Sequence, residues 1–96
     1  MYLVLYSAKW CGQCKRVLPS LKRLVGSQYR HINHLTVYDH DEDPVIFNVE
    51  KIGMIPEVHL RDALDRDFFL SCGYVDYETL KMKIDNAIEH QGALET

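Results

Sequence analysis

The sequence predicts an α/β domain with the element order β-α-β-α-β-β-α, in which a four-stranded mixed sheet is flanked by three helices. Three observations lead there: an apolar run at residues 2–6, helical spacing of apolar residues after positions 14 and 76, and alternation at residues 57–61 followed by a turn. With 96 residues, the chain has room for one domain, residues 1–96, around one core.

The first strand is expected at residues 2–6, YLVLY, because a run that is apolar on both faces suits a central strand. The following helix has one apolar face, formed by Val17, Leu18, Leu21, Leu24 and Val25. Pro19 lies inside it and should kink it, and Gly26 is the expected end. A second strand should run from about Ile32 to Asp39.

The segment DHDED, residues 39–43, is expected to form a turn that leads into a short helix. Asp43 can cap this helix, and Pro44 suits its first position because its φ is preset. The apolar side of the helix should consist of Val45, Ile46, Val49 and Ile52.

Residues 57–61 alternate, which predicts a half-exposed strand with Val58 and Leu60 inward and Glu57, His59 and Arg61 outward. DALDR then makes a hairpin turn, and DFFLSC returns as an antiparallel strand. Asp76 can cap a last helix. The apolar stripe of that helix is Leu80, Ile84, Ala87 and Ile88.

Composition disfavours several classes of partner. The net charge is −3 and no basic block occurs, so nucleic acid is not expected as a partner. No apolar run approaches the roughly 18 residues of a membrane span. The N-terminal apolar segment is short and has no charged region before it, so it reads as a strand, not a signal peptide. We expect a cytoplasmic monomer without a membrane partner.

Cys11 and Cys14 form a Cys-X-X-Cys motif at the expected start of the first helix. Free backbone N–H groups and the helix dipole favour an anion there, in this case a thiolate. In such motifs the pKa of the thiol falls from about 8.5 to about 7 or below. Cys14 lies one turn on and faces inward, so its sulfur can reach that of Cys11. This arrangement suits thiol–disulfide exchange.

Two other uses of the cysteines fit the sequence less well. A zinc site usually needs four ligands, and beyond Cys72 and five scattered histidines the chain offers no second pair with metal-ligand spacing. A purely structural disulfide would close so small a loop that it would add little stability. We expect no metal. We expect Cys72 to be a small buried hydrophobe at a strand end, and a thiol at the rim of the groove, open to modification, is the alternative.

The segment Trp10-Cys11-Gly12-Gln13-Cys14-Lys15 resembles the active-site box of the thioredoxins, with Gln13 where they usually carry proline. The resemblance spans residues 2 to about 88. The matches outside the box are Pro19, Asp43-Pro44, Met54-Ile55-Pro56 and Gly73. It implies a minimal thioredoxin fold that begins directly at the first core strand, without the extra strand and helix of the larger members.

The resemblance also implies the roles of individual residues. Cys11 would be the nucleophile and Cys14 the resolving thiol, together a redox-active disulfide with no other cofactor. The Ile55–Pro56 bond would be cis, and the backbone of Ile55 would pair with an extended substrate chain. The residues expected to line the substrate groove are Trp10, Gly12, Gln13, Ile55, Pro56 and Gly73. The expected partners are thioredoxin reductase or glutathione as electron source, and disulfide-containing proteins such as ribonucleotide reductase.

One departure from the family concerns proton transfer. Leu5 stands where thioredoxins bury an aspartate, and no lysine occurs between Lys22 and Lys51 to pair with one. Both members of the buried pair are therefore missing, which avoids a lone charge in the core. How Cys14 loses its proton stays open; water or the departing substrate thiolate are the alternatives.

Two other functions remain possible at this point. A glutaredoxin-like enzyme using glutathione would share the small size, and Asp76 after Cys72-Gly73 could bind the amine of glutathione, although a plain helix cap is the simpler role. A thioredoxin fold kept as a non-catalytic binding module is the third alternative, and the intact cysteine pair argues against it.

Overall fold

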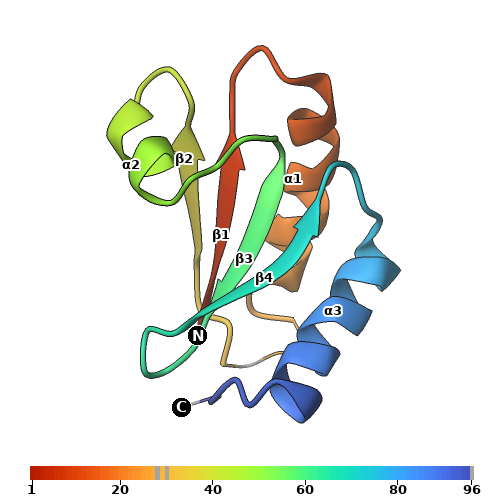
Figure 1. Ribbon diagram of the computed structural model, residues 1–96. Helices are drawn as coiled ribbons and strands as arrows, with labels where there is room; N and C mark the ends of the chain where they lie inside the picture. The colour runs from red at the N-terminus through yellow and green to blue at the C-terminus, as the bar shows by residue number, and fades with distance from the viewer. Residues whose placement is uncertain (28, 30, 96) are drawn as a thin grey trace.

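The computed structural model describes residues 1–27, 29 and 31–95 of the chain (Figure 1). Within these residues the predicted order of four strands and three helices is confirmed. The elements are β1 (Tyr2–Ser7), α1 (Gly12–Leu24), β2 (Leu35–Asp39), α2 (Pro44–Val49), β3 (Glu57–Arg61), β4 (Asp67–Cys72) and α3 (Tyr77–His90).

The strands form one mixed sheet in the order β2-β1-β3-β4. β1 is parallel to β2, with Leu5 opposite Val37, and it is antiparallel to β3. β3 and β4 form the antiparallel hairpin that the turn at residues 62–66 predicted. The apolar run of β1 thus lies at the centre of the sheet, where residues 3–6 are buried on both faces.

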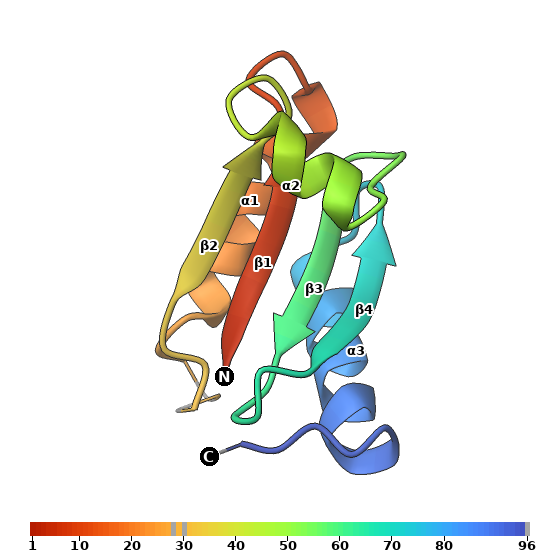
Figure 2. The same ribbon diagram turned by 60° about the vertical axis from the view of Figure 1, so that its left-hand side comes forward.

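The sheet is covered on both faces, as Figures 1 and 2 show: α1 and α3 pack on one side and α2 on the other. The ends of β1, β2 and β4 meet the start of β3 at one end of the sheet, opposite both chain termini (Figure 1). The loop after β1, which ends at Cys11, and the first turn of α1, which contains Cys14, lie at this end. The topology therefore gathers four connecting segments around the cysteine pair.

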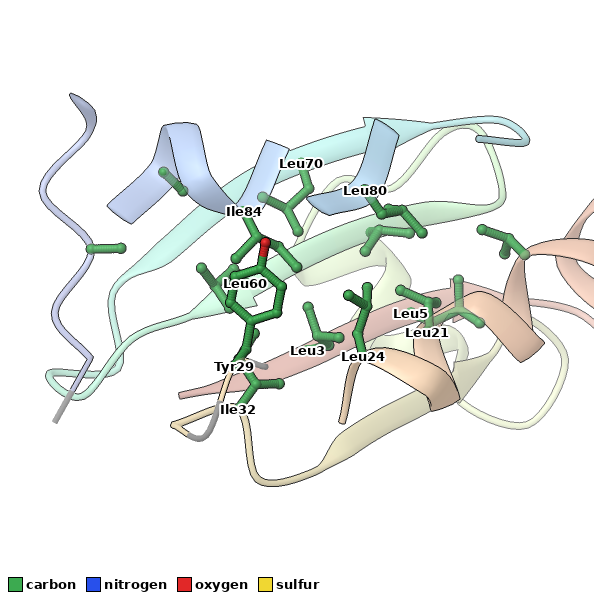
Figure 3. Packing of buried hydrophobic residues seen from close by; sticks show 14 residues of the cluster. Leu3, Leu5, Leu21, Leu24, Tyr29, Ile32, Leu60, Leu70, Leu80 and Ile84 are labelled. Carbon is green, nitrogen blue, oxygen red and sulfur yellow. The ribbon is translucent and has the colours of Figure 1, made fainter. Parts of the chain in front are cut away.

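The larger core lies between the sheet and the α1–α3 layer (Figure 3). Leu3 and Leu5 point into it from β1, and Leu21, Leu80 and Ile84 meet them from the two helices. Each of these side chains is at most 1% exposed, so the packing leaves almost no contact with water. A smaller cluster on the other face joins Val4 and Tyr6 to Phe47 of α2.

Two predicted elements differ in detail. The second strand begins at Leu35 and not at Ile32, although Ile32 is fully buried in the loop before it. In α2, Val45 and Val49 are exposed and were wrongly assigned to the apolar side. Phe47 is the buried residue because its ring packs edge-on against Tyr6, and a helix of six residues turns only one narrow face to the sheet.

His59 was predicted on the outer face of a half-exposed strand, and this was wrong: it is 7% exposed. Its ring lies edge-on to Tyr6 and Phe69. Its two nitrogens lie 2.7 Å from Asp67 Oδ2 and 2.6 Å from Glu57 Oε2. An alternating strand buries a polar residue at this position because carboxylates on both sides satisfy the ring nitrogens.

Asp62 ties the β3–β4 turn to the C-terminal segment. Its side chain is buried and accepts hydrogen bonds from the backbone N–H groups of Leu64, Arg66 and Leu94 and from the Arg66 guanidinium. Burial alone would raise the pKa of this carboxyl, but the hydrogen bonds from Leu94 and Arg66 outweigh it and hold the pKa at about 2.

Asp62 should make the stability of the protein depend on pH. Because its pKa is depressed on folding, its contribution is present above about pH 4 and is lost as the pH falls towards 2. We expect Asp62→Asn to lower the midpoint of thermal unfolding at pH 6 by several degrees. The difference in midpoint between the variant and the natural protein should become smaller below pH 4. A difference that stays constant from pH 6 to pH 2 would contradict this assignment.

Candidate active site

Cys11 caps the N-terminus of α1. Its backbone is extended, with φ −90° and ψ 111°, and its N–H donates to the carbonyl of Ala8 at 3.1 Å. The N–H of Cys14 points at the sulfur of Cys11, with 3.2 Å between N and Sγ. The sulfur therefore takes the place that a serine or aspartate oxygen holds in an ordinary helix cap, where negative charge is favoured.

The two cysteines are joined by a disulfide bond, with their Cα atoms 5.3 Å apart. Cys14 faces inward as predicted and is 3% exposed. Cys11 is 9% exposed, because Ala8 and Ile55 pack against the pair. Cys11 is thus the more solvent-accessible of the two cysteines.

Ile55 packs against the cysteine pair, and the Ile55–Pro56 bond is cis, as the resemblance implied. The Pro56 carbonyl accepts a hydrogen bond from the N–H of Gly73 at 2.8 Å, which fixes this loop to the end of β4. Within the described part of the chain, no hydrogen bond engages the backbone of Ile55. Its N–H and carbonyl are therefore available to an incoming extended chain.

Gly73 closes the far side of the site. Its φ is +81°, a conformation that other residues rarely adopt, and a Cβ there would lie 3.9 Å from the side-chain oxygen of Gln13. Gly73 therefore brings the end of β4 close to the first turn of α1. Gly12 and Gln13 lie on that turn and are exposed. Gly73 thus links the Pro56 carbonyl to the first turn of α1, next to the side chain of Gln13.

Trp10 is 65% exposed, and its indole N–H donates to Asp41 Oδ2 at 3.0 Å. The hydrogen bonds from His40 and Trp10 hold the pKa of the Asp41 carboxyl below its ordinary value. On the other flank, the Arg16 guanidinium lies 4.4 Å from the ring centre of Tyr74, which is 41% exposed. Trp10, which directly precedes Cys11, and Tyr74, which lies against Arg16 of α1, are therefore exposed aromatic rings near the start of α1.

The acidic segment from Asp39 to Asp43 is the part of this site that sequence reasoning missed. It was interpreted only as a turn and a helix cap. The available signal was its position directly after β2: because β1 and β2 are parallel, the segments that follow them lie at the same edge of the sheet. Asp43 occupies the cap position of α2, but its carboxylate accepts from the N–H of Asp39 and does not cap the helix.

Two other residues near the site were assigned a place from the sequence. Cys72 is exposed, so its prediction as a buried hydrophobe was wrong; it ends β4 opposite Glu57, where the sheet is open to solvent. Asp76 caps α3 as expected and accepts from the N–H of Thr79 at 2.8 Å, a bond that lowers the pKa of its carboxyl.

Residues 1–27, 29 and 31–95 contain neither a candidate metal centre nor a candidate membrane span. No three side chains of His, Cys, Asp or Glu come together there as the ligands of a metal ion would. No helix in these ranges combines the length and apolar character that a membrane span needs.

Comparison with known proteins gives the same family as the sequence motif. The profile of the Thioredoxin family matches residues 1–86. Among curated protein sequences, none is significantly similar to the chain.

Solved structures of thioredoxins superpose on this chain. A Plasmodium falciparum thioredoxin is 25% identical with a TM-score of 0.71, over 88% of this chain and 82% of its own. The Malassezia sympodialis thioredoxin Mala s 13 is 21% identical, with a TM-score of 0.72 over 88% and 72%. Thioredoxin 1 of Thermosipho africanus is 19% identical, with a TM-score of 0.66 over 95% and 98%. The chain therefore has the thioredoxin fold.

Proposed function

The chain belongs to the thioredoxin family, and we propose that it reduces disulfide bonds in other proteins through the Cys11–Cys14 pair. The observation that carries the proposal is the N–H of Cys14 directed at the Cys11 sulfur from the first turn of α1. A hydrogen bond to the charged form of a thiol favours that form. A thiolate is the nucleophile in disulfide exchange, so this contact prepares Cys11 for attack.

The reaction takes two steps. The Cys11 thiolate attacks one sulfur of the substrate disulfide, and the other substrate sulfur leaves as a thiolate. A mixed disulfide then joins Cys11 to the substrate. Cys14, deprotonated, attacks the Cys11 sulfur and releases the second substrate thiolate. The two electrons of the dithiol pass to the substrate, and the Cys11–Cys14 disulfide remains.

The surroundings of the pair suit an extended polypeptide substrate. The unengaged backbone of Ile55 offers one donor and one acceptor for strand-like pairing. Trp10 and Met54 are 65% and 69% exposed and supply apolar contact near Cys11. On the opposite flank stands Tyr74. Substrate side chains would therefore lie between aromatic and thioether surfaces, with main-chain hydrogen bonds setting the orientation.

The oxidised pair must receive two electrons before the next turnover. We infer that a thioredoxin reductase or glutathione supplies them, because the sequence carries no flavin or nucleotide motif. An oxidised protein such as ribonucleotide reductase represents the expected substrate class. A monomer in the reducing environment of the cytoplasm fits this cycle.

The test compares two coupled assays with the reduced protein. We expect it to reduce insulin disulfides with NADPH and thioredoxin reductase, and to be slow on a glutathione mixed disulfide with glutathione reductase. Activity only in the second assay would assign the chain to the glutaredoxin-like alternative. Activity in neither, with a Cys11→Ser, Cys14→Ser double variant fully functional in the host, would make it a binding module.

A further inference from the structure

A pocket of about 320 Å³ lies behind the cysteine pair, between α1 and the face of β1 and β2. Cys14 forms part of its wall, next to the apolar side chains of Leu5, Leu18 and Val37. A water molecule occupies about 30 Å³ in the liquid, so the pocket has room for several. This space therefore reaches the wall that Cys14 helps to form, while Cys14 itself is only 3% exposed.

Charged groups line the outer part of the same pocket. Three carboxylates line it from the end of β2 and the segment that follows, and two ammonium groups line it from the loop after β1 and from α1. These residues are Asp39, Glu42, Asp43, Lys9 and Lys15. Lys9 forms an ion pair with Glu42, which leaves Asp39 and Asp43 as the carboxylates without a lysine partner among the described residues.

The two remaining carboxylates differ in how they are held. Asp39 accepts three backbone N–H bonds, from Lys9 at 3.0 Å, Asp41 at 3.0 Å and Glu42 at 3.1 Å. Both of its carboxylate oxygens are therefore engaged in hydrogen bonds to the backbone. Asp43 accepts one, from the N–H of Asp39 at 2.9 Å through Oδ2. Its other oxygen is left to bond with water in the pocket.

We propose that the proton of Cys14 leaves through water in this pocket to the carboxylate of Asp43, a proposal that rests on the disulfide reductase function above. Leu5 and Val37, the apolar walls next to Cys14, hold no group that accepts a proton. When the mixed disulfide has formed, water takes the Cys14 proton and Asp43 receives it. The Cys14 sulfur then attacks the Cys11 sulfur, and Asp43 passes the proton to solvent. Asp39 is a positioning residue that holds the loop in place.

The experiment separates the two chemical steps in one trace. Reduced protein in a Cys72→Ser background is mixed with dithiobis(nitrobenzoate); the background removes the exposed third thiol. Attack by Cys11 releases one thionitrobenzoate, and resolution by Cys14 releases the second. We expect Asp43→Asn, which keeps the oxygen that accepts from Asp39, to leave the first release unchanged. The second release should slow about 100-fold at pH 7, the lower end of the usual range for general acid–base catalysis.

Two further variants distinguish proton transfer from a structural role. Asp43→Glu should restore the second release, and Glu42→Gln should not affect it, because Glu42 lines the same pocket but is paired with Lys9. The defect of Asp43→Asn should shrink as the pH rises, because hydroxide can then take the proton of the Cys14 thiol without a carboxylate. Natural rates in Asp43→Asn, or a defect that Asp43→Glu shares at every pH, would overturn the proposal. A natural protein that shows no second release would instead refute the reductase function.

Discussion

Replacing Cys11 with serine is expected to lower the rate of insulin reduction by about 10³-fold or more, which corresponds to about 4 kcal/mol of activation free energy. A serine hydroxyl is not ionised at neutral pH, so the N–H of Cys14 would face a neutral oxygen and no nucleophile would form. The coupled assay with NADPH and thioredoxin reductase measures the loss directly.

Two matched cysteine variants accompany this experiment. Cys72→Ser should keep the natural rate, because Cys72 is an exposed third thiol outside the pair. Cys14→Ser should attack the substrate but fail to release it, so a mixed disulfide on Cys11 should accumulate and be visible by mass spectrometry. If Cys11→Ser kept more than about a tenth of the natural activity, the nucleophile would have to be another residue.

The largest effect on stability is expected from Leu21→Ala. Leu21 is fully buried in α1, in the cluster that joins this helix to the sheet and to α3. Alanine preserves the helix but leaves a cavity, which costs about 3 kcal/mol or more. For a domain of this size the midpoint of thermal unfolding should fall by roughly 10 °C or more, as measured by calorimetry.

Met82→Ala is the matched control for the core variant. Met82 lies in α3 and is 70% exposed, so its truncation removes little packing and should change the free energy of unfolding by about 0.5 kcal/mol or less. Equal losses of unfolding free energy in Leu21→Ala and Met82→Ala would mean that the packing of α1 on the sheet does not stabilise the core.

The sequence predicts the fold well where periodicity has one physical reading. The run YLVLY is apolar on both faces, and β1 is the strand that is buried on both faces. The stripe of Leu80, Ile84 and Ala87 faces the core as its helical spacing required. In both elements the burial of apolar side chains decides the structure. The spacing of apolar residues along the sequence shows which side chains are buried.

The prediction fails where particular side-chain contacts decide burial, and not the alternation of polar and apolar residues. His59 alternates with two apolar residues and reads as exposed, but carboxylates of Glu57 and Asp67 satisfy its ring in the interior. Val45 and Val49 were predicted to be buried, but Phe47 is the residue of α2 that packs against Tyr6 of the sheet. These outcomes depend on three-dimensional neighbours that no local pattern encodes.

In the candidate site, too, one part could be predicted from local sequence and another part could not. The spacing of Cys11 and Cys14 identified the reactive pair, because their chemistry depends on a local helix start. The acidic segment from Asp39 to Asp43 was read only as a turn, since its contact with Trp10 and with the pocket behind Cys14 arises from the parallel pairing of β1 and β2.

The pKa of the Cys11 thiol is the most direct test of the proposed mechanism. In reduced Cys72→Ser protein, the rate of Cys11 alkylation by iodoacetamide is followed against pH. The hydrogen bond from the Cys14 N–H predicts a midpoint well below the ordinary thiol value of about 8.5. A midpoint at that ordinary value would show that the helix start does not stabilise the thiolate, and the account of catalysis would be wrong.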